Sequence, residues 1–193
     1  MDTNFIKDRF KESMIVKNSI IEDNTLIFKI DLLSKEIVTT LKNGSKIFLC
    51  GNGSSATVAQ NIESQMNGIF YHDRPPLNVE SLCNNTSYLT AVSNLYSFDE
   101  VYARLVLSKC NKGDMLITFS TSGNSNNIIN ALNMANNLGV KTIGFTGADP
   151  GMMLECCGEI ISVPSNNKPR INEEHMFIGN LLCEIVESII YKK

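Results

Sequence analysis

The chain has 193 residues, 43% of them hydrophobic, and a formal net charge of −3. This length suits one domain with a sizeable core, and a slightly negative charge without a basic patch argues against direct nucleic-acid binding. No apolar run is long enough to span a membrane, and the polar start of the chain is unlike a signal peptide, so we expect a cytoplasmic protein with no membrane association.

Cysteine and histidine usage predicts no zinc site of the Cys/His kind. The six cysteines lack C-x-x-C spacing and several stand in apolar runs, which is typical of reduced, structural cysteines. The chain has only two histidines, His72 and His175. A lone histidine at the start of a helix, like His175, is more often a structural or surface residue than a ligand or a base.

Two amphipathic helices are predicted before the first strand, at residues 3–22 and 25–42. Both segments carry apolar residues at helical spacing, and Asn43-Gly44 is a typical helix end. Helices outside a core sheet leave an apolar stripe exposed unless another subunit covers it. We therefore expect a single domain over residues 1–193, with 1–43 used in oligomer packing and 44–193 forming an α/β core.

Strands and helices then alternate along the chain. Strands are expected at 46–50, 77–82, 115–119, 141–145 and 159–163, and helices at 56–66, 86–92, 98–107, 126–138, 152–156 and 171–191, with a polar loop at 164–169. This alternation predicts a doubly wound, mainly parallel five-stranded sheet flanked by helices, similar to the flavodoxin fold, with a long C-terminal helix. Ligands of such sheets bind at the carboxyl ends of the strands.

Two small polar loops are expected at that edge, at residues 51–55 and 120–125. The second reads Ser-Thr-Ser-Gly-Asn-Ser between a strand and a helix. Helix capping needs one hydroxyl, whereas several hydroxyls and free N–H groups at a helix N-terminus suit an anion. There is no Walker lysine and no G-x-G-x-x-G, so the pattern predicts a small phosphorylated ligand. Glycines and Ser55 in the first loop allow its close approach.

Both loops resemble signatures of the sugar-isomerase (SIS) domain. The matching stretches are Cys50-Gly51-Asn52-Gly53-Ser54-Ser55-Ala56 and Phe119-Ser120-Thr121-Ser122-Gly123-Asn124-Ser125. Arg74-Pro75, Leu89-Thr90-Ala91, Lys141-Thr142-Ile143-Gly144, Val163-Pro164-Ser165 and Arg170-Ile171 extend a likeness to the phosphoheptose isomerase family over nearly the whole chain. The resemblance implies the SIS fold, a homotetramer with sites between subunits, and isomerisation of sedoheptulose 7-phosphate for heptose synthesis.

By this resemblance, a set of small polar residues would hold the phosphorylated sugar. The candidates are Asn52, Gly53, Ser55, Asn85, Ser120, Thr121, Ser122, Ser125 and Asn172.

The family's zinc and proton-transfer positions carry other residues in this chain. Where the family has His and Glu four residues apart, this chain has Asn61 and Gln65; where it has Gln and His eight residues apart, this chain has Asn172 and Asn180. Each spacing places both side chains on one helical face. Carboxamides do not titrate near neutral pH and are poor zinc ligands, so no zinc and no confident catalytic residue are expected. Three further family positions differ, at Ile69, Asn85 and Leu95.

Three functions remain open from the sequence. The first is a sugar-phosphate-binding protein with weak or no isomerase activity, and the second is a working phosphoheptose isomerase. The third is an adaptor of the replication initiator, because one non-catalytic branch of the family also has Asn at position 180 and lacks the Glu at position 65. The stretches 99–104 and 174–176 are similar to that branch, whereas Asn61 and Asn172 depart from it.

Overall fold

The structure, a computed structural model, describes residues 2–191. Its core is a five-stranded, all-parallel sheet with the strand order β2-β1-β3-β4-β5. The strands are β1 (Ile47–Gly51), β2 (Val79–Ser81), β3 (Met115–Phe119), β4 (Lys141–Thr146) and β5 (Glu159–Ser162). This arrangement confirms the predicted doubly wound sheet, and every pairing is parallel.

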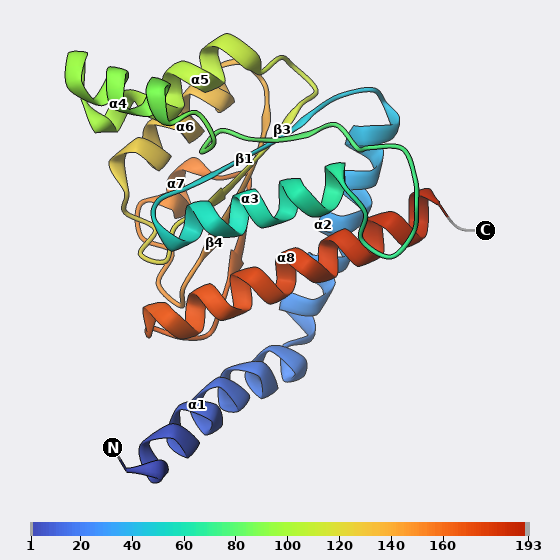
Figure 1. The fold of residues 1–193 in the computed structure, drawn as a ribbon, viewed down its shortest axis with the longest axis vertical. Coiled ribbons are helices and arrows are strands. Elements are labelled where there is room, and N and C mark those ends of the chain that lie inside the picture. Colours follow the sequence, from blue (N-terminus) through green and yellow to red (C-terminus); the bar gives the residue numbers. More distant parts are fainter. Residues whose placement is uncertain (1, 192–193) are drawn as a thin grey trace.

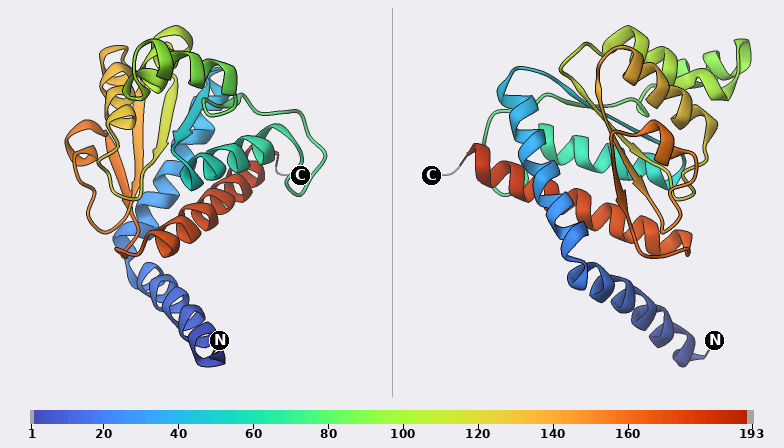
Figure 2. Two further views of the ribbon diagram at one scale, coloured as in Figure 1. Left: turned by 60° about the vertical axis from the view of Figure 1, so that its left-hand side comes forward. Right: turned by 180° about the vertical axis from the view of Figure 1, so that it is seen from behind.

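Helices cover both faces of the sheet (Figures 1 and 2). One face carries α2 (Asn24–Lys42), α3 (Ser54–Asn67) and α8 (Lys168–Ile190), and the other carries α5 (Val101–Lys109) and α6 (Asn126–Asn137). The remaining helices are α1 (Thr3–Glu22), α4 (Thr86–Leu95), the 3₁₀ turn η1 (Phe98–Glu100) and α7 (Met153–Cys156). The first helix extends away from the body of the fold (Figure 1).

The sheet core forms because the central strands are apolar throughout. All residues of β1 and β3 are buried, as expected for parallel strands covered on both faces. Gly51 pairs with Phe119, and Phe119 pairs with Phe145, so the carboxyl ends of β1, β3 and β4 lie level. The chain passes from β1 to β2, on one side of β1, and then to β3, on the other side of β1. This reversal creates the switch point at which ligands of such sheets bind.

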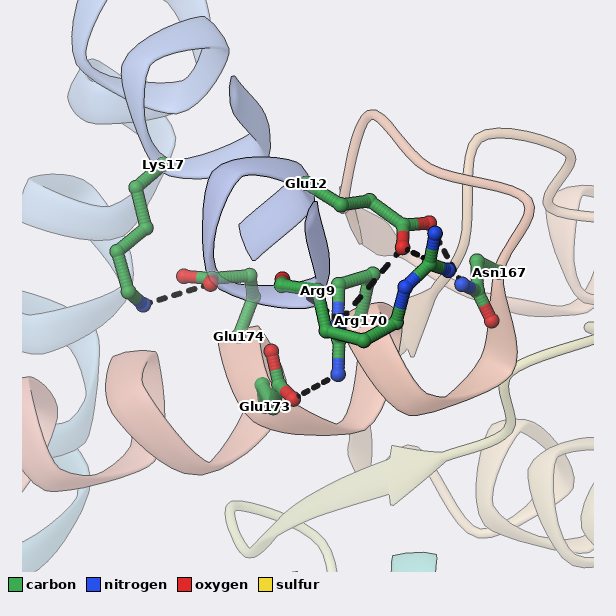
Figure 3. Close-up of polar contacts among 7 residues, drawn as sticks. All are labelled: Arg9, Glu12, Lys17, Asn167, Arg170, Glu173 and Glu174. Carbon is green, nitrogen blue, oxygen red and sulfur yellow. Dashed lines mark hydrogen bonds and ion pairs between the residues drawn. The ribbon is translucent and has the colours of Figure 1, made fainter. Parts of the chain in front are cut away.

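A polar seam attaches α1 to the first half of α8 (Figure 3). Lys17 Nζ lies 2.6 Å from Glu174 Oε1, and the Glu174 side chain is only 1% exposed. Asn167 Nδ2 donates to Glu12 at 2.6 Å, and Arg170 pairs with both Glu12 and Glu173. Val16 and Ile20 of α1 are buried, whereas most of its other apolar residues face outward. Phe5, Ile6, Phe10, Met14, Ile15 and Ile21 are each 48–69% exposed.

Two predicted boundaries were wrong. The last helix begins at Lys168, inside the segment expected to be a polar loop, and Pro169 stands in its first turn. Proline is tolerated there because the first N–H groups of a helix have no intrahelical partner. The helix expected at 98–107 is divided into η1 and α5, and the Ser97 hydroxyl caps η1 by accepting from Asp99 N.

Within residues 2–191, no helix combines the length and apolar character needed to cross a bilayer. All six cysteines are free thiols, four of them buried, which agrees with their predicted structural role.

Candidate functional site

The hydroxyl-rich 120–125 loop lies at the carboxyl end of β3. Ser120 N donates to Phe145 O at 2.9 Å, which ties the loop to the neighbouring strand end. Ser125 occupies the N-cap position of α6, yet its side chain makes no capping hydrogen bond. Its hydroxyl lies 3.3 Å from that of Ser120. Capping therefore does not account for this hydroxyl, and an anion placed here would meet two hydroxyls at a helix N-terminus.

Gly123 and Asn124 fix the shape of this loop. Gly123 has φ +64°, and a Cβ added to it would lie 1.8 Å from Pro150 O, so no other residue fits without displacing the backbone. Asn124 Oδ1 accepts from Met152 N at 2.9 Å, and Met153 N donates to Gly123 O at 3.0 Å. Backbone hydrogen bonds at the start of α7 thus hold the 120–125 loop in place.

The 51–55 loop is joined to α6 by a reciprocal amide pair. Asn52 Nδ2 donates to Asn127 Oδ1 at 2.8 Å, and Asn127 Nδ2 donates to Asn52 Oδ1 at 2.9 Å. Asn127 is 2% exposed. It lies in the first turn of α6 and so sets the spacing between the two loops. Sequence reasoning missed Asn127, because an asparagine inside a helix carries no motif that identifies its partner.

Ser55 and Asn172 meet where α3 begins. Ser55 Oγ lies 3.4 Å from Asn172 Oδ1, and Asn172 Nδ2 donates to Ser54 Oγ at 2.8 Å. Ser55 is buried, and Gly53, two residues before it, has φ +54° and open space at its Cβ position. The start of α8 therefore contributes a polar side chain to the edge formed by the two loops.

The other candidates lie farther from this cluster. Thr121 and Ser122 line an open hollow of about 250 Å³, together with Asn124, Asp149, Asn166, Lys168 and Ile171. The Ser122 hydroxyl also accepts from Asn124 N at 3.3 Å. Asn85 caps α4 by accepting from Tyr88 N at 2.9 Å. No hydrogen bond within residues 2–191 links Asn85 to either loop, so its role in ligand binding stays a prediction.

Three carboxamides meet farther along the contact between α3 and α8. Asn61 Nδ2 donates to Asn180 Oδ1 at 2.9 Å, and Gln65 Nε2 lies 3.5 Å from Asn61 Oδ1. The helices approach closely here, because a Cβ on Gly179 would come within 2.8 Å of Ile62. Asn61 and Gln65, which were expected to share a face of α3, thus lie together with Asn180 of α8. Asn172, expected on the same face as Asn180, bonds to Ser54 instead.

These side chains do not fit the zinc ion of the resembled family. Zinc prefers thiolate, imidazole and carboxylate ligands, whereas this set offers neutral amides that already bond to one another. Among the described residues, no group of three or more His, Cys, Asp or Glu side chains is placed to hold a metal ion. We therefore derive no chemistry through a metal at this position.

A buried ion pair lies beside the end of α3 that carries Gln65. Arg74 Nε lies 2.9 Å from Glu187 Oε1, and the two side chains are 2% and 1% exposed. Arg74 also donates to the carbonyl oxygens of Gln65 and Met66 at 2.9 and 2.7 Å, which satisfies free carbonyls at the end of α3. Glu187 accepts from Tyr71 N at 3.0 Å. Arg74 thereby fixes the backbone that carries Gln65.

His175 is a structural residue and does not lie on the surface. It is fully buried beside the rings of Phe119 and Phe145. Its Nε2 lies 3.1 Å from Thr146 O, and because a carbonyl only accepts, Nε2 carries the proton. Nδ1 has no partner. Burial lowers the pKa of His175 to about 4, so the ring is neutral at pH 7.

Comparison with known proteins identifies the family. The SIS domain model matches residues 15–147. Phosphoheptose isomerase 2 of Campylobacter jejuni is 42% identical over 98% of this chain and 94% of its own length, and the phosphoheptose isomerase of Aneurinibacillus thermoaerophilus is 40% identical over 97% and 95%.

Solved structures agree with this match. A phosphoheptose isomerase from Francisella tularensis superimposes with a TM-score of 0.92 at 33% identity, covering 97% of this chain and 100% of that one. The enzyme from Neisseria gonorrhoeae gives 0.90 at 31% identity, covering 96% and 98%. The fold is thus the SIS fold, and the chain belongs to the phosphoheptose isomerase family.

Proposed function

We propose that this protein binds a phosphorylated sugar, with seven carbons as the first candidate, at the edge formed by the 51–55 and 120–125 loops. The observation that carries the proposal is the pair of hydroxyls on Ser120 and Ser125, which lie 3.3 Å apart at the start of α6 without capping it. Ser55, Asn52 and Asn172 would contact the rest of the ligand. Relatives named phosphoheptose isomerase support a sugar phosphate as the ligand class.

We further propose that the protein isomerises such a ligand weakly or not at all. Aldose–ketose isomerisation needs a group that moves a proton between neighbouring carbons. Gln65 and Asn180 cannot titrate near neutral pH. His175 is not available in their place, because it is fully buried with no exposed ring atom to meet a substrate.

The alternative function is a working phosphoheptose isomerase. Likeness to enzymes of that name over 98% of the chain favours it. It requires a proton-transfer group outside the carboxamide positions.

We also propose that the protein forms a homo-oligomer, a homotetramer by the family resemblance, through α1. The support is the exposed apolar face of this helix, which the polar seam with α8 holds in a fixed direction. Residues 1–43 would then serve assembly, and residues 44–193 the ligand site.

Calorimetric titration with sedoheptulose 7-phosphate tests ligand binding. The wild-type protein should bind, Ser120→Ala should bind at least several-fold more weakly because a hydroxyl hydrogen bond to the phosphate is lost, and the control Ser108→Ala on α5 should match the wild type. Equal affinity of Ser120→Ala and wild type would refute the placement. Zinc analysis of the same sample addresses the chemistry, since stoichiometric zinc would contradict the non-catalytic proposal.

A further inference from the structure

The last carbonyl group of β1 points beyond the end of the neighbouring strand β2. Leu49 O accepts from Leu82 N at 2.8 Å, and carbonyl groups two residues apart in a strand face the same side. Gly51 O therefore faces this side as well. The next N–H along the chain, that of Cys83, donates to Ser81 Oγ at 3.3 Å instead. Because Gly51 is buried, its carbonyl needs a donor from elsewhere in the fold.

Tyr102 of α5 supplies this donor. Its hydroxyl lies 2.6 Å from Gly51 O, and the residue is 3% exposed. A carbonyl only accepts, so the tyrosine hydroxyl donates. The Cys83 thiol lies 3.4 Å from both oxygens and completes a small buried cluster. Burial raises the pKa of Tyr102, so the hydroxyl keeps the proton that it donates.

The Gly51 carbonyl stands where β1 passes into the 51–55 loop. The peptide bond after Gly51 is planar, so a fixed carbonyl also fixes the direction of Asn52 N–H. The loop folds back closely over this point, because a Cβ on Gly51 would lie 2.7 Å from the backbone of Ser55. The Asn52 side chain is held from α6. Both anchors thus come from the sheet face that carries α5 and α6, although the loop leads into α3 on the opposite face (Figure 2).

We propose that Tyr102 is a positioning residue for the sugar-phosphate site. Its hydroxyl holds the Gly51 carbonyl and thereby fixes the 51–55 loop relative to the 120–125 loop, which opens α6. The inference rests on the proposed function, because it takes the phosphate to lie on the 120–125 loop and the sugar to contact the 51–55 loop. Loss of the hydroxyl should therefore weaken binding of the sugar and leave binding of the phosphate group unchanged.

Calorimetric titration with two probes, sedoheptulose 7-phosphate and inorganic phosphate, tests this role. Tyr102→Phe keeps the ring and removes the hydroxyl. It should bind sedoheptulose 7-phosphate about fivefold more weakly than the wild type, the change expected for one lost hydrogen bond. It should bind inorganic phosphate as the wild type does. Tyr88→Phe is the matched control, because the hydroxyl that it removes donates to Val101 O at 3.1 Å and not to the loop.

Two further measurements separate positioning from a general loss of stability. The melting temperatures of Tyr102→Phe and Tyr88→Phe should both fall, whereas only Tyr102→Phe should bind the seven-carbon probe more weakly. Cys83→Ala leaves the tyrosine hydroxyl on Gly51 O, so it should bind both probes as the wild type does.

Three results would overturn the role of Tyr102. They are unchanged affinity of Tyr102→Phe for sedoheptulose 7-phosphate, equal weakening for both probes, and equal weakening in Cys83→Ala or Tyr88→Phe. Failure of the wild type to bind either probe would instead refute the proposed function itself.

Discussion

Acid should destabilise this protein partly through His175, and the size of the effect follows from its burial. The ring has a pKa of about 4 in the folded protein and about 6.5 when unfolded. Below pH 6.5 the unfolded chain binds a proton that the folded chain does not, so stability falls as the pH drops from about 6.5 to about 4. At pH 5 the loss from this residue alone is about 2 kcal/mol, taking 1.36 kcal/mol per pKa unit.

Urea unfolding of the wild type and His175→Gln at pH 7.0, 6.0 and 5.0, at one protein concentration, measures this contribution of His175 to stability. Glutamine can still donate to Thr146 O but cannot titrate. The variant should be less stable at pH 7 because its shape fits the pocket less well, and the gap should narrow by about 2 kcal/mol at pH 5. The carboxyl groups are the same in both proteins, so their effect cancels in the difference between the two free energies of unfolding. Parallel stability curves over this range would refute the assigned proton position and burial effect.

Three further predictions follow from the contacts around the site. Asn127→Leu leaves Asn52 without its reciprocal partner, so sedoheptulose 7-phosphate should bind several-fold more weakly in calorimetry; an unchanged dissociation constant would mean that the pair does not position the loop. Arg74→Met leaves the buried Glu187 carboxylate without its partner and should lower the free energy of unfolding in urea by about 3–5 kcal/mol. The double variant Arg74→Met with Glu187→Leu should regain most of this stability. No regain would show that the arginine acts through the α3 carbonyls alone. Phe10→Glu on α1 should lower the molar mass in light scattering, whereas Asn133→Glu on α6 should not; equal masses would contradict assembly through α1.

The sequence predicts the sheet well because its strands are short apolar runs bounded by turn residues. Residues 115–119 were placed correctly, since a strand buried on both faces has no polar position to obscure it. The start of α8 was misplaced because Pro169 reads as a loop residue, although proline is equally at home in a first helical turn.

The site was predicted only where a local motif exists. The 120–125 loop stands out by its hydroxyls. Helical spacing paired Asn61 with Gln65 and Asn172 with Asn180, and only the family resemblance grouped the two pairs, of which the structure joins Asn61 and Asn180. Asn127 and the pairing of Arg74 with Glu187 were not predicted, because these contacts depend on how distant segments are folded together. The Arg74 and Glu187 positions, for example, are 113 residues apart in the sequence.

The central claim is that the protein binds a sugar phosphate without isomerising it. Proton NMR of sedoheptulose 7-phosphate incubated with the purified protein, with and without zinc, tests it most directly. We predict ligand line broadening with no product signals, and product only with zinc and a variant carrying Asn61→His, Gln65→Glu, Asn172→Gln and Asn180→His. Product formed by the natural chain would contradict the claim and show that another group moves the proton.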